Sequence, residues 1–408
     1  MPFSNLVKYL NIDLEKIKNE HLNTIFYGGL LEQELSNLAK NNLPYGKVAI
    51  LYTKESYLNY GQKFSTALKS KGNSVTHLVL PDNFADTIES YSHVFNLAED
   101  VRLIVATNKK FFGVAKYFAK IRETSVALVA SSLNDYDLLC PTVEFLNFGK
   151  KEIVTVNPKT HVLFDFCMLE QAQDFADCYA FIVSHALALA DYRASCLMLN
   201  KKINKDAFVL ASKAITNAYP LFTYPNNEQP SKLFLGFLYL ELANNLSKGE
   251  LYNTFSCRQA SAFLNEENLG LGAKLLLTAK PTSEIYKIAM SGEYDKIMDY
   301  ANYLTRADWI SKKLKILPKT VVEQLILQSN VIKSHRKSIA IIKQSLSKDV
   351  DSFVDCGDKM ISTFTALGGD TQIDVVARAK AVKHSGDLVL NGMSLVRESG
   401  ISEYIIST

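Results

Sequence analysis

The stretch that decides the fold runs from Val101 to Pro141 and reads VRLIVATNKKFFGVAKYFAKIRETSVALVASSLNDYDLLCP. Val101–Ala106 is a short apolar run rich in β-branched residues, the pattern of a strand buried on both faces. Lys109–Ile121 carries apolar residues at helical spacing, and Ser125–Ala130 is a second apolar run. A strand–helix–strand unit of this length predicts parallel pairing with a right-handed crossover.

Ligands of such sheets bind at the edge where the parallel strands end. In this stretch the two strands end at Thr107–Lys109 and at Ser131–Tyr136. We therefore expect a bound ligand to contact these two segments.

The same alternation continues on both sides of the central unit. Further short apolar runs, separated by helical patterns, occur at Lys47–Thr53, Val75–Leu80, Ile153–Val156 and Val162–Phe166. This alternation predicts an α/β domain with a mainly parallel, Rossmann-like sheet. We place this domain at residues 1–166, with residues 1–40 as a helical N-terminal extension.

After about residue 167 the strand signal stops. Asp174–Leu199 is one long helical pattern rich in Ala and Leu, and further helical patterns follow as far as residue 398. Breaks fall at pairs such as Lys280-Pro281 and Gly368-Gly369. The sequence thus predicts an all-helical C-terminal domain over residues 167–408.

Composition narrows the class of protein. A length of 408 residues suits two domains that each bury a core, and a net charge of +3 gives no reason to expect nucleic acid or a membrane surface as partner. The six cysteines form no CxxC pair, which favours reduced, buried thiols. With no apolar run of membrane-spanning length, we expect a cytoplasmic protein.

Four segments, in this order along the chain, resemble motifs of one superfamily. They are Gly113–Tyr117 (GVAKY), Asn157–Asp165 (NPKTHVLFD), Ala188–Arg193 (ALADYR) and Val382–Gly400. The chain resembles the dehydroquinate synthase and iron-containing alcohol dehydrogenase superfamily, and within it the glycerol-1-phosphate dehydrogenases. The resemblance implies a nucleotide domain followed by a helical domain, NAD(P) as cofactor, and zinc or iron as the activating metal.

The dinucleotide motif of that family is altered here. Thr107, Asn108 and Lys109 stand where the resemblance places a glycine turn, whose bare backbone approaches a pyrophosphate closely. Gly113 stands at a family aspartate, and in the loop after the next strand only the hydroxyl of Ser131 matches. The family-equivalent cofactor positions are therefore Thr107, Asn108, Lys109 and Ser131.

The metal motif is altered further. The position of the family's metal carboxylate is Phe181, and the segments that should carry histidine ligands, Pro230–Leu240 and Ser256–Arg258, contain none. None of the seven histidines lies between His185 and His335. We therefore predict no metal ligands and no catalytic residues.

Other chemically suggestive residues have structural interpretations. His185 shares a predicted helix with Asp177, but we interpret His185 as a hydrogen-bonded core residue and Asp177 as a helix-dipole partner. We interpret Cys257 as an inert thiol, because no histidine is placed to activate it. The basic stretches Ser311–Lys315 and Lys333–Lys337 are interpreted as solvated helix surface.

Three functions stay open, and the sequence does not decide whether the chain is an enzyme. We favour a catalytically degenerate dehydrogenase-fold protein without cofactor. It would have a binding or regulatory role toward an unknown protein or small molecule, and it could be a homo-oligomer. The first alternative is an active NAD(P)- and metal-dependent polyol phosphate dehydrogenase of the glycerol-1-phosphate type. The second is a metal-free binder or enzyme of phosphorylated metabolites that uses an interdomain cleft, with Lys109 or Lys110 on the phosphate.

Overall fold

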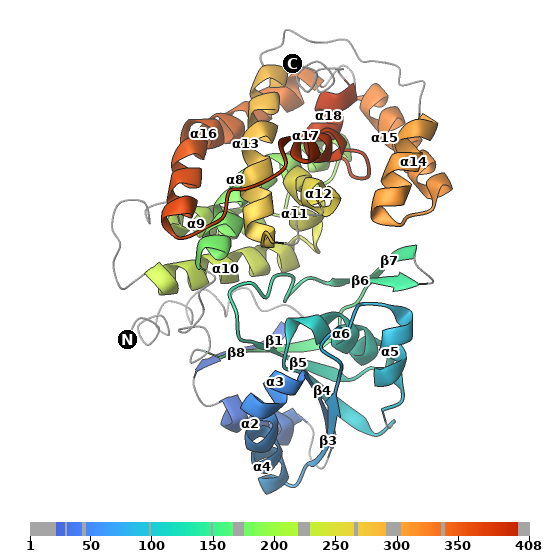
Figure 1. Ribbon diagram of the computed structural model, residues 1–408, viewed down its shortest axis with the longest axis vertical. Helices are drawn as coiled ribbons and strands as arrows, with labels where there is room; N and C mark the ends of the chain where they lie inside the picture. Colours follow the sequence, from blue (N-terminus) through green and yellow to red (C-terminus); the bar gives the residue numbers. More distant parts are fainter. Residues whose placement is uncertain are drawn as a thin grey trace. The chain divides into compact units, whose positions relative to one another are not determined.

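The computed structural model divides the chain into two compact units, residues 1–172 and 173–408, each described by itself (Figure 1). The structure describes residues 22–28, 31–42, 46–97, 99–147, 150–165, 175–218, 229–264, 268–290, 303–335 and 339–398. The expected domain boundary between residues 166 and 167 lies outside these ranges.

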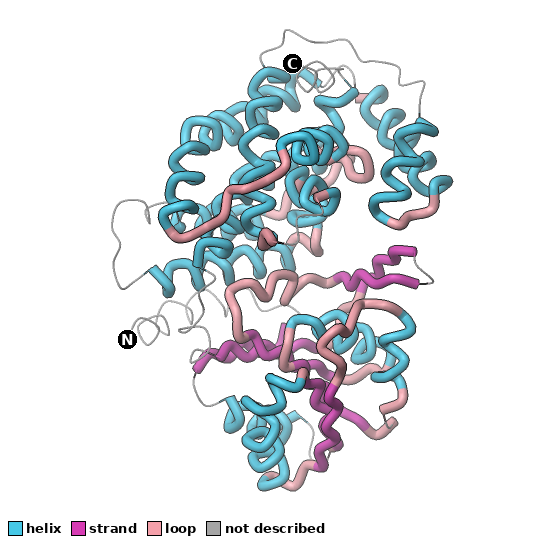
Figure 2. Tube along the Cα trace, in the orientation of Figure 1, coloured by secondary structure: helices cyan, strands magenta, loops and turns pink. Residues whose placement is uncertain are grey.

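The first unit is built on a six-stranded parallel sheet, which confirms the predicted α/β class (Figure 2). Its strand order is β1-β8-β5-β4-β2-β3. The strands are β1 (Leu22–Gly28), β2 (Lys47–Tyr52), β3 (Ser74–Val79), β4 (Val101–Ala106), β5 (Ser125–Ala130) and β8 (Lys159–Asp165). The predicted unit around β4 and β5 is thus the centre of the sheet.

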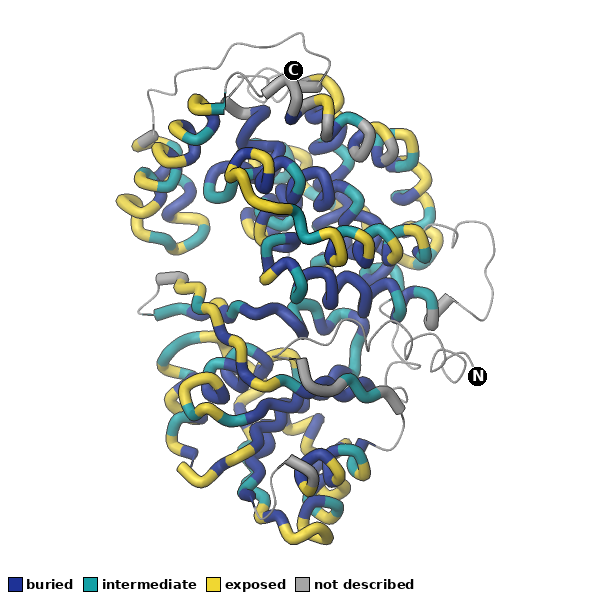
Figure 3. The backbone as a smooth tube through the Cα atoms, turned by 180° about the vertical axis from the view of Figure 1, so that it is seen from behind, coloured by how far each residue is buried: buried dark blue, intermediate teal, exposed yellow. Residues whose placement is uncertain are grey.

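Helices cover both faces of this sheet. Helix α2 (Leu31–Asn42) and helix α4 (Gln62–Ser70) bury Leu35 and Phe64 against the β2 and β4 side chains. Between β2 and α4 lie α3 (Lys54–Ser56) and a π-helical turn, η1 (Tyr57–Gly61). On the other face are η2 (Lys109–Phe111), α5 (Ile88–Phe95) and α6 (Phe112–Ile121). The central strands between these layers are buried (Figure 3).

The expected helical extension over residues 1–40 is wrong at Leu22–Gly28, which forms β1 and pairs with β8. The run LNTIFYG is rich in β-branched and aromatic residues and is followed by Gly29, so it suits an edge strand. Residues 1–21 lie outside the described ranges. A hairpin of β6 (Thr142–Asn147) and β7 (Lys150–Thr155) precedes β8, and its first strand is not among the strands that the sequence predicts.

The described part of the second unit consists of helices and loops, as predicted for an all-helical domain. The helices are α8 (Phe175–Met198), α9 (Lys205–Ala218), α10 (Gln229–Leu246), α11 (Glu250–Asn253), α12 (Ser256–Phe263), α13 (Leu271–Met290), α14 (Tyr303–Leu314), α15 (Pro318–Ser334), α16 (Ile339–Ala366), α17 (Val375–His384) and α18 (Gly392–Glu398). Helix α8 is buried on nearly every side, because α9, α10, α11, α12, α13, α16 and α18 pack around it.

The expected helix break at Lys280-Pro281 is wrong, because α13 runs through Pro281. Leu276, Ala279 and Ile285 are buried on both sides of the proline. Packing of this buried helix therefore outweighs the local cost of the missing backbone donor.

One buried carboxylate ties four helices of the second unit together. Asp191 on α8 accepts hydrogen bonds from the Ser256 amide (2.8 Å) and hydroxyl (2.6 Å), the Tyr286 hydroxyl (2.5 Å) and the Gly392 amide (2.9 Å). Gly392 has to lack a side chain, since a Cβ there would lie 2.7 Å from the Tyr286 ring. Burial raises the pKa of Asp191 to about 6, although the bonds from Ser256 and Tyr286 act in the opposite direction.

Replacing Asp191 by alanine should destabilise the helical unit by about 3 kcal/mol or more, because it leaves several buried donors without an acceptor. The measurement is urea unfolding followed by the fluorescence of Trp309, the only tryptophan, which lies on α14. The exposed Asp351→Ala variant on α16 is the control and should change the unfolding free energy by less than about 0.5 kcal/mol. Equal effects of the two variants would show that the Asp191 contacts contribute nothing.

The raised pKa of Asp191 predicts a pH dependence with a definite sign. Between the ordinary value of 3.8 and the folded value of about 6, the folded state binds more protons than the unfolded state. Stability should therefore fall as pH rises through this window. Asp191→Asn removes this titration, so its Tm should depend less steeply on pH than the wild-type Tm; equal slopes would contradict the assignment.

Candidate functional site

The switch point of the sheet lies between β2 and β4, where the chain leaves in opposite directions toward β3 and β5. Three buried hydroxyls occupy it. Thr107 Oγ1 lies 2.8 Å from both Leu51 O and Ser56 Oγ, and Thr53 Oγ1 lies 3.1 Å from Ser56 Oγ. Thr53 and Ser56 also form the capping box of α3. Thr107 was predicted to contact a cofactor, and its hydroxyl instead makes hydrogen bonds within the protein.

Asn108 and Lys109 lie at the start of the helix that follows β4. Asn108 Oδ1 accepts the Lys110 amide at 3.0 Å and caps the short helix η2. Lys109 Nζ donates to Asn134 O at 3.2 Å, and Lys110 Nζ donates to Asp82 O at 2.6 Å. The structure therefore brings Lys109 to the loop after β5, and each of these side chains has a partner within the protein.

In the loop after β5, two backbone amides bind the carboxylate of a residue in the same loop. The amides of Ser131 and Ser132 donate to Asp135 Oδ2 at 3.0 and 3.1 Å, and Asp135 is buried. Adjacent amides pointing at one oxygen are the arrangement that binds anions, and here a carboxylate of the chain fills it. The sequence analysis missed Asp135 because it singled out only the hydroxyl of Ser131 in this loop.

Gly113, at the family aspartate position, has little space around its Cα. A Cβ there would lie 3.0 Å from Asp86 Oδ1 and 3.1 Å from the Tyr91 hydroxyl. The Tyr91 hydroxyl donates to Asp86 at 3.0 Å, and burial raises the pKa of Asp86 to about 6. An aspartate at position 113 would place a second carboxylate against that of Asp86, and the two would repel each other. These residues do not fit the family's way of holding a pyrophosphate.

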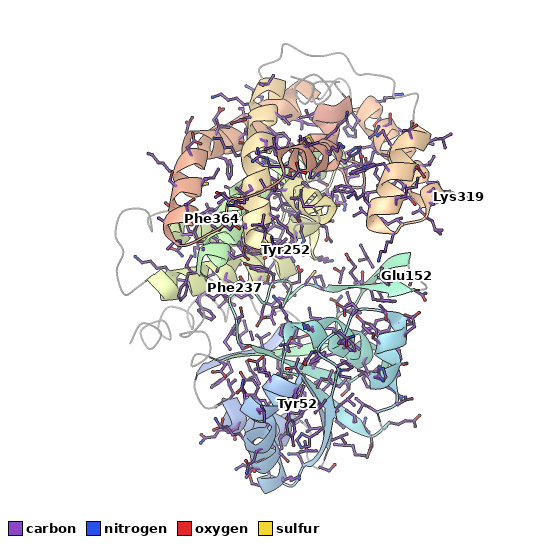
Figure 4. All side chains as sticks on the ribbon, in the orientation of Figure 1. Tyr52, Glu152, Phe237, Tyr252, Lys319 and Phe364 are labelled. Carbon is purple, nitrogen blue, oxygen red and sulfur yellow. The ribbon has the colours of Figure 1, made fainter. Side chains whose placement is uncertain are left out.

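In the second unit, Phe181, which the sequence resemblance aligns with the family's metal carboxylate, is fully buried. Its ring centroid lies 4.5 Å from that of His185 and 5.7 Å from that of Tyr252, which is labelled in Figure 4. His185 also contacts Phe255, with ring centroids 5.0 Å apart. The Tyr252 hydroxyl donates to Glu241 Oε1 at 3.1 Å. Phe181, His185, Tyr252 and Phe255 therefore form one aromatic cluster in the core of this unit.

The structural interpretation of His185 is confirmed. The imidazole is fully buried, and its Nδ1 lies 2.6 Å from Phe181 O. Because a carbonyl only accepts, Nδ1 carries the proton of this bond. His185 thus closes a turn of α8 from within the core.

Asp177 and Cys257 also have structural roles. Asp177 lies in the first turn of α8, as the helix-dipole interpretation requires, and its Oδ1 also accepts the Ala273 amide at the start of α13 at 2.8 Å. Burial raises the pKa of the Cys257 thiol to about 12, which keeps it protonated and unreactive at neutral pH.

The residues present do not fit a divalent metal ion at the family position. Phe181 offers no donor atom, and within the described ranges no three His, Cys, Asp or Glu side chains come together as a metal site. Among the described helices, none is both long enough and apolar enough to span a bilayer.

Neither a family model nor a curated protein matches this sequence. Solved structures do match over most of the chain. A halo-thermophilic archaeal alcohol dehydrogenase from a Red Sea brine pool aligns with a TM-score of 0.56 and 13% identity, over 94% of this chain and 98% of that one. A sulfoacetaldehyde reductase from Bifidobacterium kashiwanohense, solved with NAD+, aligns with a TM-score of 0.57 and 14% identity, over 94% and 97%.

A glycerol dehydrogenase from Schizosaccharomyces pombe aligns with a TM-score of 0.51 and 12% identity, over 94% of this chain and 89% of that one. Likeness at this level of identity concerns the fold, whereas activity depends on the site residues. The chain has the fold of the iron-containing alcohol dehydrogenases and glycerol dehydrogenases.

Proposed function

We propose that this chain is a catalytically degenerate dehydrogenase-fold protein that acts by binding or regulating a partner. The observation that supports this is the buried aromatic cluster of Phe181, His185 and Tyr252, because the sequence resemblance aligns Phe181 with the family's metal carboxylate. Alcohol oxidation by the family's route needs a metal to polarise the substrate oxygen. A phenylalanine packed in the core supplies no such ligand.

The nucleotide half supports the same interpretation. Asp135 occupies the amides of Ser131 and Ser132, and the side chains of Asn108 and Lys109 stand where the family has bare backbone. An incoming pyrophosphate would have to displace a buried carboxylate and would be repelled by its charge. In the nucleotide half, hydrogen bonds within the protein thus already occupy the groups that a pyrophosphate would bind.

In a thermal melt, NAD+, NADP+, Zn2+ and Fe2+ at millimolar or saturating concentration should leave the Tm unchanged, singly and in pairs. A ligand at about 100 times its Kd adds about 2.7 kcal/mol of stability, which a melt detects readily. Elemental analysis of the purified protein should find less than about 0.1 equivalent of zinc or iron. A metal-dependent shift with turnover of glycerol 1-phosphate would establish the active dehydrogenase instead.

Restoring the family carboxylate should not restore a metal site. Phe181→Asp replaces a packed ring by a buried charge and should destabilise the helical unit by more than about 3 kcal/mol in urea unfolding. The control Phe181→Leu keeps an apolar side chain and should cost less than about 2 kcal/mol. A folded Phe181→Asp protein holding one equivalent of zinc would contradict the proposal.

Substituting the lysines beside β4 distinguishes a phosphometabolite binder. Lys109→Ala and Lys110→Ala should each change the Tm by less than about 2 °C, because exposed side chains contribute little. Neither variant should alter the response to glycerol 1-phosphate or inorganic phosphate, since the wild type should not respond. A phosphate-dependent shift that is present in the wild type and lost in Lys109→Ala would favour the phosphometabolite binder.

A further inference from the structure

The turn that joins α14 to α15 concentrates positive charge. Between Asp308 and Glu323 the chain carries four lysines and no acidic residue. The lysines are Lys312, Lys313, Lys315 and Lys319. All four side chains are exposed, and Lys319 is labelled in Figure 4. We call residues 312–320 the tip. The net charge of the whole chain is only +3, because acidic residues elsewhere offset this local concentration.

The protein neutralises these charges only in part. Lys312 Nζ lies 2.7 Å from Asp308 Oδ2, and Lys319 Nζ lies 3.9 Å from Glu323 Oε1. Both pairs join side chains one helical turn apart on an exposed surface, where ion pairs are weak. Among the described residues, the other two lysines of the tip have no acidic partner. The tip therefore presents positive charge to whatever binds there.

An exposed leucine lies between these lysines in a position that usually holds a polar residue. Leu317 is 52% exposed and is the N-cap of α15, where serine, threonine, aspartate and asparagine are preferred. Its side chain makes no capping hydrogen bond. Lys315 has a φ of +55°, in the left-handed region where glycine is unstrained. Two residues of the tip thus lower local stability, a departure expected at functional positions.

The backbone on both sides of Leu317 is constrained. The Ser311 hydroxyl donates to Ile316 O and so ties the end of α14 to the turn. Pro318 begins α15, and its ring restricts Leu317 to extended backbone. Leu317 and the lysines around it therefore belong to an ordered surface.

The residue types of the tip favour one class of partner. Protein–protein interfaces are depleted in lysine and enriched in arginine and aromatic residues, and the tip sequence contains neither. Nucleic-acid binding without sequence preference stacks bases on aromatic side chains, which the tip sequence also lacks. A phosphate backbone would leave Leu317 in water. An anionic lipid surface attracts lysines and also takes up an apolar side chain below the head groups.

We propose that the tip docks this protein on membranes that contain anionic lipids. The lysine ammonium groups lie at the level of the head groups, and Leu317 enters the boundary of the acyl chains beneath them. Each lysine at such a surface strengthens binding about fivefold. Binding built from four lysines and one leucine is reversible and weakens as salt screens the charges. The assignment is independent of whether the chain has lost its catalysis.

The test is co-sedimentation of the full chain with phosphatidylcholine vesicles, with and without about 30% phosphatidylserine. Wild type should bind the anionic vesicles at about 0.1 M salt and lose at least about tenfold in partition coefficient at about 0.5 M salt or without phosphatidylserine. Leu317→Ser should weaken binding about tenfold, since it removes a buried apolar side chain. Lys315→Gly should weaken binding about fivefold, since it removes one charge.

The same two variants should not lower the Tm. A serine at position 317 supplies the missing cap of α15, and a glycine at position 315 accepts the positive φ. Weaker binding by variants at least as stable as wild type separates docking from folding. The matched controls are Leu304→Ser, at the other end of α14, and Lys202→Gly, before α9; both alter exposed residues and should leave vesicle binding unchanged.

Three outcomes contradict the proposal. The first is a wild type that does not sediment with phosphatidylserine vesicles. The second is a loss of binding in the control variants as large as in the tip variants. The third is retention of the chain on single-stranded RNA, without vesicle binding, that Leu317→Ser leaves intact; this result would assign the lysines to nucleic acid.

Discussion

The helical unit depends on the hydrogen bonds of one carboxylate. Asp191 is fully buried, and Ser256, Tyr286 and Gly392 bring donors to it from three other helices. A buried charge is tolerated only when such donors compensate its lost hydration. The segment ALADYR, which resembles a family motif, therefore has a structural explanation that requires neither metal nor nucleotide. Its presence fits a degenerate protein as well as an active one.

The two units share one physical property at the positions that the sequence resemblance aligns with the family's ligand sites. In the sheet unit, Asp135 fills the amides after β5, and in the helical unit, the Phe181 ring packs against His185 and Tyr252. In each case side chains of the protein itself satisfy the polar groups or fill the volume. A ligand there would compete with interactions already made, which weakens binding by the free energy of breaking them. This competition is the physical basis of the proposed loss of catalysis.

The centre of the sheet could be predicted from the sequence, because β4, α6 and β5 show their periodicity within one contiguous stretch. The sequence did not predict the elements whose structure depends on contacts with distant parts of the chain. Strand β1 exists because it pairs with β8, far along the chain, and α13 continues through Pro281 because it is packed on both sides. The donors of Asp191 come from residues 65, 95 and 201 positions away, a coincidence that no local pattern encodes. The positions Thr107, Asn108, Lys109 and Ser131 were located by motif, but their internal partners became visible only in three dimensions.

The distance along the chain between Asp191 and Gly392 has a consequence for synthesis in the cell. The Gly392 amide reaches the carboxylate from 201 residues downstream, so it leaves the ribosome some 10 to 40 seconds later at about 5 to 20 residues per second. During that interval the Asp191 carboxylate lacks its Gly392 donor, and α8 cannot yet bury all of its apolar side chains. The helical unit can therefore complete the set of donors around Asp191 only after translation has passed residue 392.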